Sequence, residues 1–88
     1  MKKKGLKAIY FQAYWDGCFE ERDFFADYCK ENIIPFEFID AESENGVKMS
    51  IMHTVRNCPT ILFFQNGKEI ARYRGKDFVK NGADFINE

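Results

Sequence analysis

The residues of this 88-residue chain best suited to covalent chemistry are its three cysteines, Cys18, Cys29 and Cys58. A thiol reacts as the thiolate, and its exchange with a disulfide passes through a mixed disulfide. The cysteines are odd in number and far apart, and they lack the paired short spacings of zinc or iron–sulfur sites. We therefore expect reduced thiols, a cytoplasmic location, no metal and no cofactor.

Cys18 follows Asp16 and Gly17 at the start of a segment with helical spacing. The first turn of a helix lowers a cysteine pKa, because its unpaired N–H groups favour the anion. Negative neighbours raise that pKa, and Asp16, Glu20 and Glu21 flank this position. A reactive Cys18 and an inert cysteine at a helix start are both consistent with this pattern.

The remaining polar candidates have simpler interpretations. Cys29 falls close to the apolar face of the same helix, so we expect it to serve packing. His53 has no Cys, Asp or second His at ligand spacing, which favours a surface helix residue. Arg56, Arg72 and Arg74 are consistent with a solvated face.

Composition limits the partners of the chain. Lys and Arg number 13 against 14 Asp and Glu, so no strong field attracts nucleic acid or an anionic membrane. Hydrophobic residues make up 45% of the chain, which is enough for one packed domain over residues 1–88. Lys7 interrupts the apolar run after the basic start, which predicts a strand rather than a secretory signal. We expect a monomer, with an outer strand over 33–39 open to pairing with another chain.

The apolar spacing predicts an α/β domain of order β-α-β-α-β-β-α. The predicted strands cover 6–14, 33–40, 60–64 and 68–74. The predicted helices cover 18–31 and a short stretch from Val47 to Val55. Asp77 can cap a last helix, whose inward residues would be Phe78, Val79, Phe85 and Ile86. Asn66-Gly67 is a strong hairpin signal, so the last two strands are antiparallel. The expected core contains Ile9, Phe11, Phe38, Ile61 and Phe63.

Segments in this order resemble the thioredoxin family over nearly the whole chain. Tyr10–Trp15 resembles the family's strand ending in Phe-x-Ala-x-Trp, and Val55–Thr60 is similar to its loop with a cis proline, here Pro59. Phe64–Ile70 and Gly75 resemble its closing hairpin and the glycine before its last helix. The resemblance implies a thioredoxin-like, four-stranded mixed sheet with helices on both faces. It also implies that the extra N-terminal strand and helix of full-length thioredoxins are absent.

The chain departs from the family at the redox motif. In place of Trp-Cys-Gly-Pro-Cys it has Trp15-Asp16-Gly17-Cys18-Phe19. Without a gap, Asp16 replaces the attacking cysteine and Phe19 the resolving one. With one residue deleted, which also aligns the apolar helix positions better, Cys18 takes the resolving position and Asp16 keeps the attacking one. Both alignments leave the chain without Cys-x-x-Cys.

The resemblance also assigns roles around this motif. The family's buried acid and buried lysine fall on Tyr10 and Phe36, so the proton relay is lost. The residue before the cis proline lies beside the family's active-site cysteines and offers its backbone to substrate. Cys58 is thus either a redox companion of Cys18 or a small apolar residue filling the loop. The implied substrate-binding residues are Trp15, Asp16, Gly17, Phe19, Pro59 and Thr60.

Two functions follow. The first is an atypical thiol-disulfide oxidoreductase of cell redox homeostasis, in which Cys18 forms a mixed disulfide with a protein and Cys58 or glutathione resolves it. The second is a redox-inactive adaptor that holds a partner peptide in the groove around Trp15 and cis-Pro59. The fold alone does not choose between them.

We predict little or no insulin reduction with dithiothreitol, because Asp16 occupies the attacking position in both alignments and the first covalent step loses its sulfur. The turbidity of the precipitating insulin chain measures this activity, with an ordinary thioredoxin as the positive control. Turnover close to that of the control would contradict the prediction and make Cys18 and Cys58 a full catalytic pair.

Overall fold

The computed structural model describes residues 5–13, 17 and 19–81. Its elements are β1 (Leu6–Gln12), α1 (Phe19–Glu31), β2 (Phe36–Asp40), α2 (Glu44–Met52), β3 (Thr60–Gln65), β4 (Lys68–Arg74) and α3 (Gly75–Asn81). The predicted order β-α-β-α-β-β-α is confirmed. Within the described residues, no helix combines the length and the apolar character that crossing a bilayer requires.

The four strands form one mixed sheet in the order β2-β1-β3-β4. β1 runs parallel to β2 and antiparallel to β3, and β3 runs antiparallel to β4. The hairpin between β3 and β4 closes through Asn66 and Gly67, which both have positive φ angles, of 53° and 83°. A two-residue turn of this kind needs left-handed backbone at both positions, which Asn-Gly supplies at low cost.

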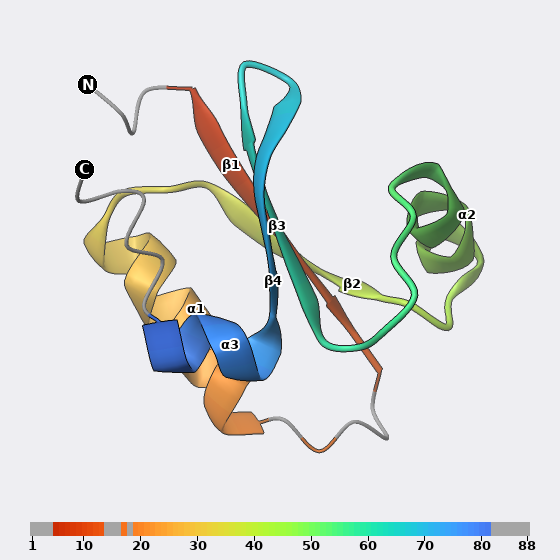
Figure 1. The fold of residues 1–88 in the computed structure, drawn as a ribbon, viewed down its shortest axis with the longest axis horizontal. Coiled ribbons are helices and arrows are strands. Elements are labelled where there is room, and N and C mark those ends of the chain that lie inside the picture. The colour runs from red at the N-terminus through yellow and green to blue at the C-terminus, as the bar shows by residue number, and fades with distance from the viewer. Residues whose placement is uncertain (1–4, 14–16, 18, 82–88) are drawn as a thin grey trace.

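Helices cover both faces of the sheet (Figure 1). α1 and α3 lie on one face and α2 lies on the other. Phe25 of α1 is fully buried on the first face, where its ring meets those of Tyr10 and Phe78 at centroid distances of 5.1 and 6.0 Å. Cys29 is buried in the same cluster, so its predicted packing role is confirmed.

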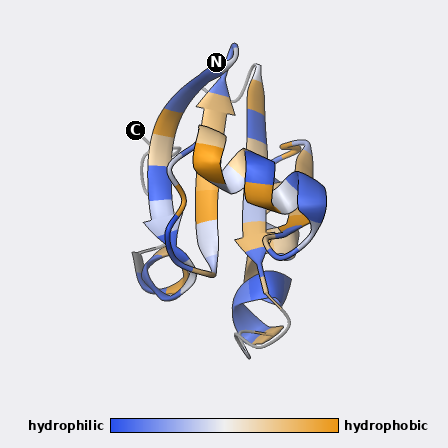
Figure 2. Cartoon of the chain, turned by 90° about the vertical axis from the view of Figure 1, so that its right-hand side faces the viewer, coloured by the Kyte–Doolittle hydropathy of each residue, from blue (hydrophilic) through white to orange (hydrophobic). Residues whose placement is uncertain are grey.

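A smaller apolar cluster joins the second face to α2. It contains Ile9, Phe11, Ile39 and Leu62, with Met49 and Val55 packed against it. Figure 2 views the chain from this side and shows hydrophobic and hydrophilic residues interspersed along the helix. The helix itself was predicted, but its side chains Val47, Ile51 and Met52 remain exposed.

Two expectations about β2 are corrected. The strand begins at Phe36 and not at Ile33, which is 86% exposed with a φ of 55°. Phe38 was expected in the core but is 38% exposed, because β2 is an edge strand and one side of it has no neighbouring strand among the described residues. The other four expected core residues are buried.

The last helix also differs from its prediction. α3 begins at Gly75, so Asp77 lies in its first turn instead of capping it. Phe78 is fully buried as expected, whereas Val79 is 38% exposed. The expected inward positions of Phe85 and Ile86 lie outside the described residues.

The start of α2 is held closely against the end of β2. Ser43 caps the helix: its Oγ accepts a hydrogen bond from the N–H of Gly46 at 2.9 Å and donates one to the carbonyl of Asp40 at 2.7 Å. Gly46 is buried, and a Cβ atom there would overlap the carbonyl oxygen of Asp40. The approach of α2 to the sheet therefore requires glycine at this position.

We predict that Gly46→Ala lowers the free energy of unfolding by about 1–3 kcal/mol, because backbone atoms must shift to admit the methyl group. Helix propensity alone predicts the opposite sign, a gain of about 1 kcal/mol. Urea denaturation followed by circular dichroism measures the difference. The control Lys48→Ala, at an exposed position of the same helix, should stay within about 0.5 kcal/mol of the parent. A more stable Gly46→Ala protein would refute the close approach.

Candidate functional site

The structure places the described members of the predicted site around the start of β3 and the start of α1. Cys58 and Pro59 end the loop between α2 and β3, and Thr60 opens β3. Gly17 and Phe19 lie at the start of α1, and both are exposed. Trp15, Asp16 and Cys18 lie outside the described residues. Whether Cys18 and Cys58 approach one another therefore stays a prediction.

The loop Thr54–Pro59 is held along its length by hydrogen bonds. At its start, the N–H of Val55 donates to the carbonyl of Ser50 at 2.8 Å. At its end, the hydroxyl of Thr60 donates to the carbonyl of Asn57, and the carbonyl of Pro59 accepts from the N–H of Gly75 at 3.1 Å. The Cys58–Pro59 peptide bond is cis, the form that the family resemblance implies. The loop is thus anchored to both α2 and α3.

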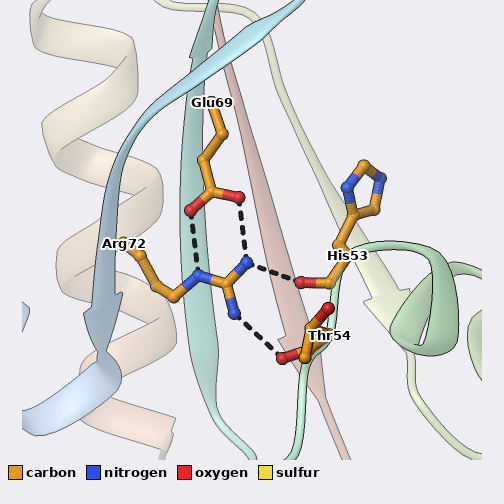
Figure 3. Close-up of polar contacts among 4 residues, drawn as sticks. All are labelled: His53, Thr54, Glu69 and Arg72. Carbon is orange, nitrogen blue, oxygen red and sulfur yellow. Dashed lines mark hydrogen bonds and ion pairs between the residues drawn. The ribbon is translucent and has the colours of Figure 1, made fainter.

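Arg72 of β4 connects the sheet to the end of α2 and the start of this loop (Figure 3). Its guanidinium donates to both carboxylate oxygens of Glu69 at 2.9 Å, and it also donates to the carbonyls of His53 and Thr54. His53 is the C-cap of α2 and Thr54 follows it, so both carbonyls lie at the helix end, where backbone acceptors lack partners within the helix. Arg72 therefore fixes the point at which the chain leaves α2 and enters the loop.

A β-bulge allows Arg72 and Glu69 to meet. Residues three apart on a regular strand point to opposite faces. Here Phe64 pairs with Glu69 and Phe63 pairs with Ala71, so Ile70 is an extra residue on β4. The bulge returns Glu69 and Arg72 to the same face as Leu62 and Phe64, which is the α2 face.

Cys58 lines an open hollow of about 450 Å³ beside the loop. Val47, Ser50 and Ile51 of α2 form one wall, and the loop forms the other. Cys58 is half-buried, so its thiol lies at the boundary between the packed interior and this hollow. Cys29, by contrast, is fully buried, and burial raises the pKa of its thiol to about 12. Of the two described cysteines, only Cys58 is placed for chemistry with an external partner.

A second hollow, of about 430 Å³, lies on the opposite side of the same loop. Arg56 and Asn57 line it from the loop, Thr60 from β3, and Arg72 and Arg74 from β4. Thr60 pairs with Arg74 across the two strands, so their side chains share a face. The loop therefore separates the hollow that is walled by α2 from the hollow that is lined by arginines.

The entry to α1 is organised by another arginine. The guanidinium of Arg22 donates to the carbonyl of Ala13 at 3.1 Å, and its carbon lies 4.9 Å from the centroid of the Phe19 ring. Ala13 directly follows β1, so this side chain connects the chain before and after the segment that contains Trp15, Asp16 and Cys18. Phe19 stays 64% exposed, as a contact residue requires.

The structure also describes His53, Tyr10 and the residue types that could bind a metal. His53 was expected on the surface of a helix, but it is the C-cap of α2 and packs half-buried against Phe64, with ring centroids 5.2 Å apart. Tyr10, at the position of the family's buried acid, is fully buried among aromatic rings. Within the described ranges, no group of three His, Cys, Asp or Glu residues is arranged to hold a metal ion.

Three site features escaped the sequence analysis. They are the ion pair of Glu69 with Arg72, the hydrogen bond from Arg22 to Ala13, and the close approach at Gly46. The contact between Arg72 and the end of α2 joins residues that are distant in sequence. Such a contact leaves no periodic pattern, so the sequence offered no signal for it. Gly46, a glycine inside a helical pattern, was a signal that a close contact exists.

Comparisons with known proteins agree with this geometry. Among solved structures, a thioredoxin from Fasciola hepatica superposes with a TM-score of 0.79 at 25% identity, covering 98% of this chain and 84% of that one. The germline-specific thioredoxin Deadhead of Drosophila melanogaster gives 0.78 at 21% identity, covering 93% and 79%. The oxidised thioredoxin of Plasmodium falciparum gives 0.70 at 20% identity, covering 90% and 82%. No protein-family model and no curated protein matches the chain.

We predict that the ion pair with Arg72 makes stability depend on pH. The hydrogen bonds from Arg72 lower the pKa of Glu69 below its ordinary value. The contribution of the pair is therefore fully present above the ordinary glutamate pKa of about 4.3 and is lost as the pH falls through the lowered pKa. Because both side chains are about one-third exposed, Glu69→Gln should cost about 1 kcal/mol at neutral pH and nothing in acid.

Urea denaturation over a pH series measures this dependence. Glu42→Gln, at an exposed glutamate outside β4, is the matched control and should leave the profile unchanged. A Glu69→Gln protein whose stability loss persists in acid would show that the carboxylate acts through packing and not through its charge.

We predict that iodoacetamide modifies Cys58 and Cys18 at least about tenfold faster than Cys29 in the folded protein. Burial raises the Cys29 pKa from 9.0 to about 12, which lowers its thiolate population at neutral pH about a thousandfold. Mass spectrometry of proteolytic peptides after timed labelling gives the order. Labelling in denaturant is the control, since all three cysteines should then react at similar rates. Finding Cys29 fastest would contradict the helix phase of α1.

Proposed function

Because the chain has a thioredoxin-like fold, we propose that it binds an extended segment of a partner protein along the loop Thr54–Pro59 and exchanges disulfides with it. Cys18 is the attacking thiol and Cys58 is its companion. The observation that carries the proposal is the position of Cys58, half-buried and lining a hollow at the loop. The proposal makes the chain an atypical oxidoreductase that acts on the disulfides of segments its loop binds, and not a general reductant of insulin.

The anchoring of the loop supports this proposal. A bound extended segment gains affinity from main-chain hydrogen bonds, and these require a rigid partner strand or loop. Arg72 holds the start of the loop and Gly75 holds its end, so few conformations need to be lost on binding. The exposed ring of Phe19 offers an apolar contact at the entry to α1.

The proposed exchange balances as two thiol–disulfide steps. The thiolate of Cys18 attacks one sulfur of the partner's disulfide, which forms a mixed disulfide and releases the other sulfur as a thiolate that takes up a proton. The thiolate of Cys58, or of glutathione, then attacks Cys18 and releases the second partner thiol. The chain ends with a Cys18–Cys58 disulfide or with a glutathione adduct, and the partner has gained two electrons.

Cys18 directly precedes α1 in the sequence, and the N–H groups of a first helical turn favour a thiolate that lies beside them. Glu20 and Glu21 lie in that same turn and oppose the effect. The balance between these two influences decides whether exchange occurs at a useful rate.

Binding without exchange is the second candidate function. The observation that favours it is the pair of hollows on the two sides of the loop, together with the exposed side chains Val47, Ile51 and Met52 of α2. These surfaces need no thiol to hold a partner segment. In this case the chain is an adaptor.

The test uses a fluorescent peptide cyclised by one disulfide, incubated with the reduced protein. Fluorescence anisotropy reports binding, and mass spectrometry after acid quenching reports mixed disulfides. We expect an adduct that Cys18→Ser abolishes and that Cys58→Ser makes longer-lived, because the resolving thiol is lost. Cys29→Ala is the control and should form the adduct as the parent does.

Each outcome selects one function. Binding without an adduct supports the adaptor and removes the oxidoreductase. An adduct that forms on Cys29, or that persists in Cys18→Ser, shows that the wrong thiol has been assigned. If the peptide neither binds nor reacts, both functions fail.

A further inference from the structure

The arginine-lined hollow beside the loop is formed by segments that are distant in sequence. Arg56 and Asn57 come from the loop, Arg72 and Arg74 from β4, and Asp77 from α3. Its volume of about 430 Å³ falls in the range of sites that take a few side chains of a ligand. The hollow therefore has the size and the convergence of elements that a binding site needs.

The lining of this hollow is positively charged, although the whole chain carries a small net negative charge. The whole chain carries a formal charge of −1. Three arginines and one aspartate line the hollow, so the lining itself carries a formal charge of +2. Guanidinium groups present planar, forked donors that fit carboxylates and phosphates. The lining is therefore suited to an anionic group.

The arginines play different parts. Arg72 is engaged by Glu69 and by the two carbonyls at the end of α2, so its charge is already compensated. Arg56 and Arg74 are exposed and flank the hollow from the loop and from the strand end. Like charges gathered in one hollow repel one another, and a bound carboxylate relieves that repulsion.

The hollow is continuous with the surface that the proposed function uses. Thr54, Val55, Arg56 and Asn57 line both this hollow and the one that contains Cys58. A ligand chain that crosses the loop therefore meets apolar side chains of α2 on one side and guanidiniums on the other. A free phosphate ion lacks the apolar part, and a long polyanion is disfavoured by the net negative charge of the chain.

We propose that the partner segment held by the loop Thr54–Pro59 is acidic, and that Arg56 and Arg74 select it by binding its carboxylates in the arginine-lined hollow. This inference rests on the proposed function, since it names the kind of protein segment that the same loop binds. It makes Arg56 and Arg74 specificity-determining residues. Arg72 is a positioning residue that fixes the loop between the two hollows.

The test compares two fluorescent peptides of equal length that share one apolar residue and one cysteine. In one peptide the flanking residues are aspartates, and in the other they are asparagines. Fluorescence anisotropy should show the aspartate peptide binding about tenfold more tightly, with an affinity that falls as salt is added. The asparagine peptide should bind weakly and with little dependence on salt.

The matched variants are Arg56→Gln/Arg74→Gln and Lys30→Gln/Lys68→Gln. Both remove two positive charges from exposed positions, but only the first pair lies in the hollow. We expect the arginine variant to lose the preference for aspartate and to keep the weak affinity for the asparagine peptide. The lysine variant should keep the preference. Circular dichroism confirms that both variants are folded.

The outcomes separate this inference from the proposed function. Equal affinity for the two peptides overturns the acidic preference and leaves the proposed function standing. Failure of both peptides to bind overturns both. Displacement of the aspartate peptide by inorganic phosphate, at concentrations where chloride has no effect, shows a simple anion site and overturns the assignment to a protein segment.

Discussion

The guanidinium of Arg72 connects three parts of the chain that sequence separates: strand β4, the end of α2 and the loop that leads to Pro59. It reaches the carbonyls of His53 and Thr54 while Glu69 holds it in a bidentate pair. The pair exists because the bulge at Ile70 places Glu69 and Arg72 on the same face of β4. With a regular strand at this point, the end of α2 would lose its charged partner on β4.

The shape of the candidate site depends on these hydrogen bonds of Arg72. The loop borders two hollows of similar volume, one walled by α2 and the other lined by Arg72 and Arg74 of β4, and Arg56 lines both. Gly46 contributes from the other end of α2, because its lack of a side chain lets the helix approach Asp40 and sets the distance between the helix and the sheet. The half-buried Cys58 lies where the loop meets the first hollow, whereas Cys29 is held inert in the core. In the proposed function, binding and thiol chemistry therefore share one small surface.

Local pattern was sufficient for the order of elements and for most of the interior. Asn66-Gly67 predicted a hairpin, which the structure closes with two positive φ angles, and the compact apolar run 60–64 predicted a strand that is largely buried. Phe38 was misplaced although its strand was expected at the outside of the sheet, because the sequence does not show how far a residue on such a strand is covered by its neighbours. The Glu69–Arg72 pair could not be foreseen, since a bulge changes which residues share a face and leaves no clear mark in a single sequence. The candidate site was predicted from its cysteines and its proline, whereas the arginines were interpreted as a solvated face and their grouping beside the loop required the fold.

The central claim is that the loop between α2 and β3 is the surface that holds a partner segment. Amide chemical shifts of the ¹⁵N-labelled protein, recorded while a disulfide-containing acidic peptide is added, test it most directly. The account predicts saturable shifts at Thr54–Cys58 and at Arg72–Arg74, the residues that line the two hollows. Saturable shifts confined to β2 or to α1, with the amides of the loop unchanged, would contradict it.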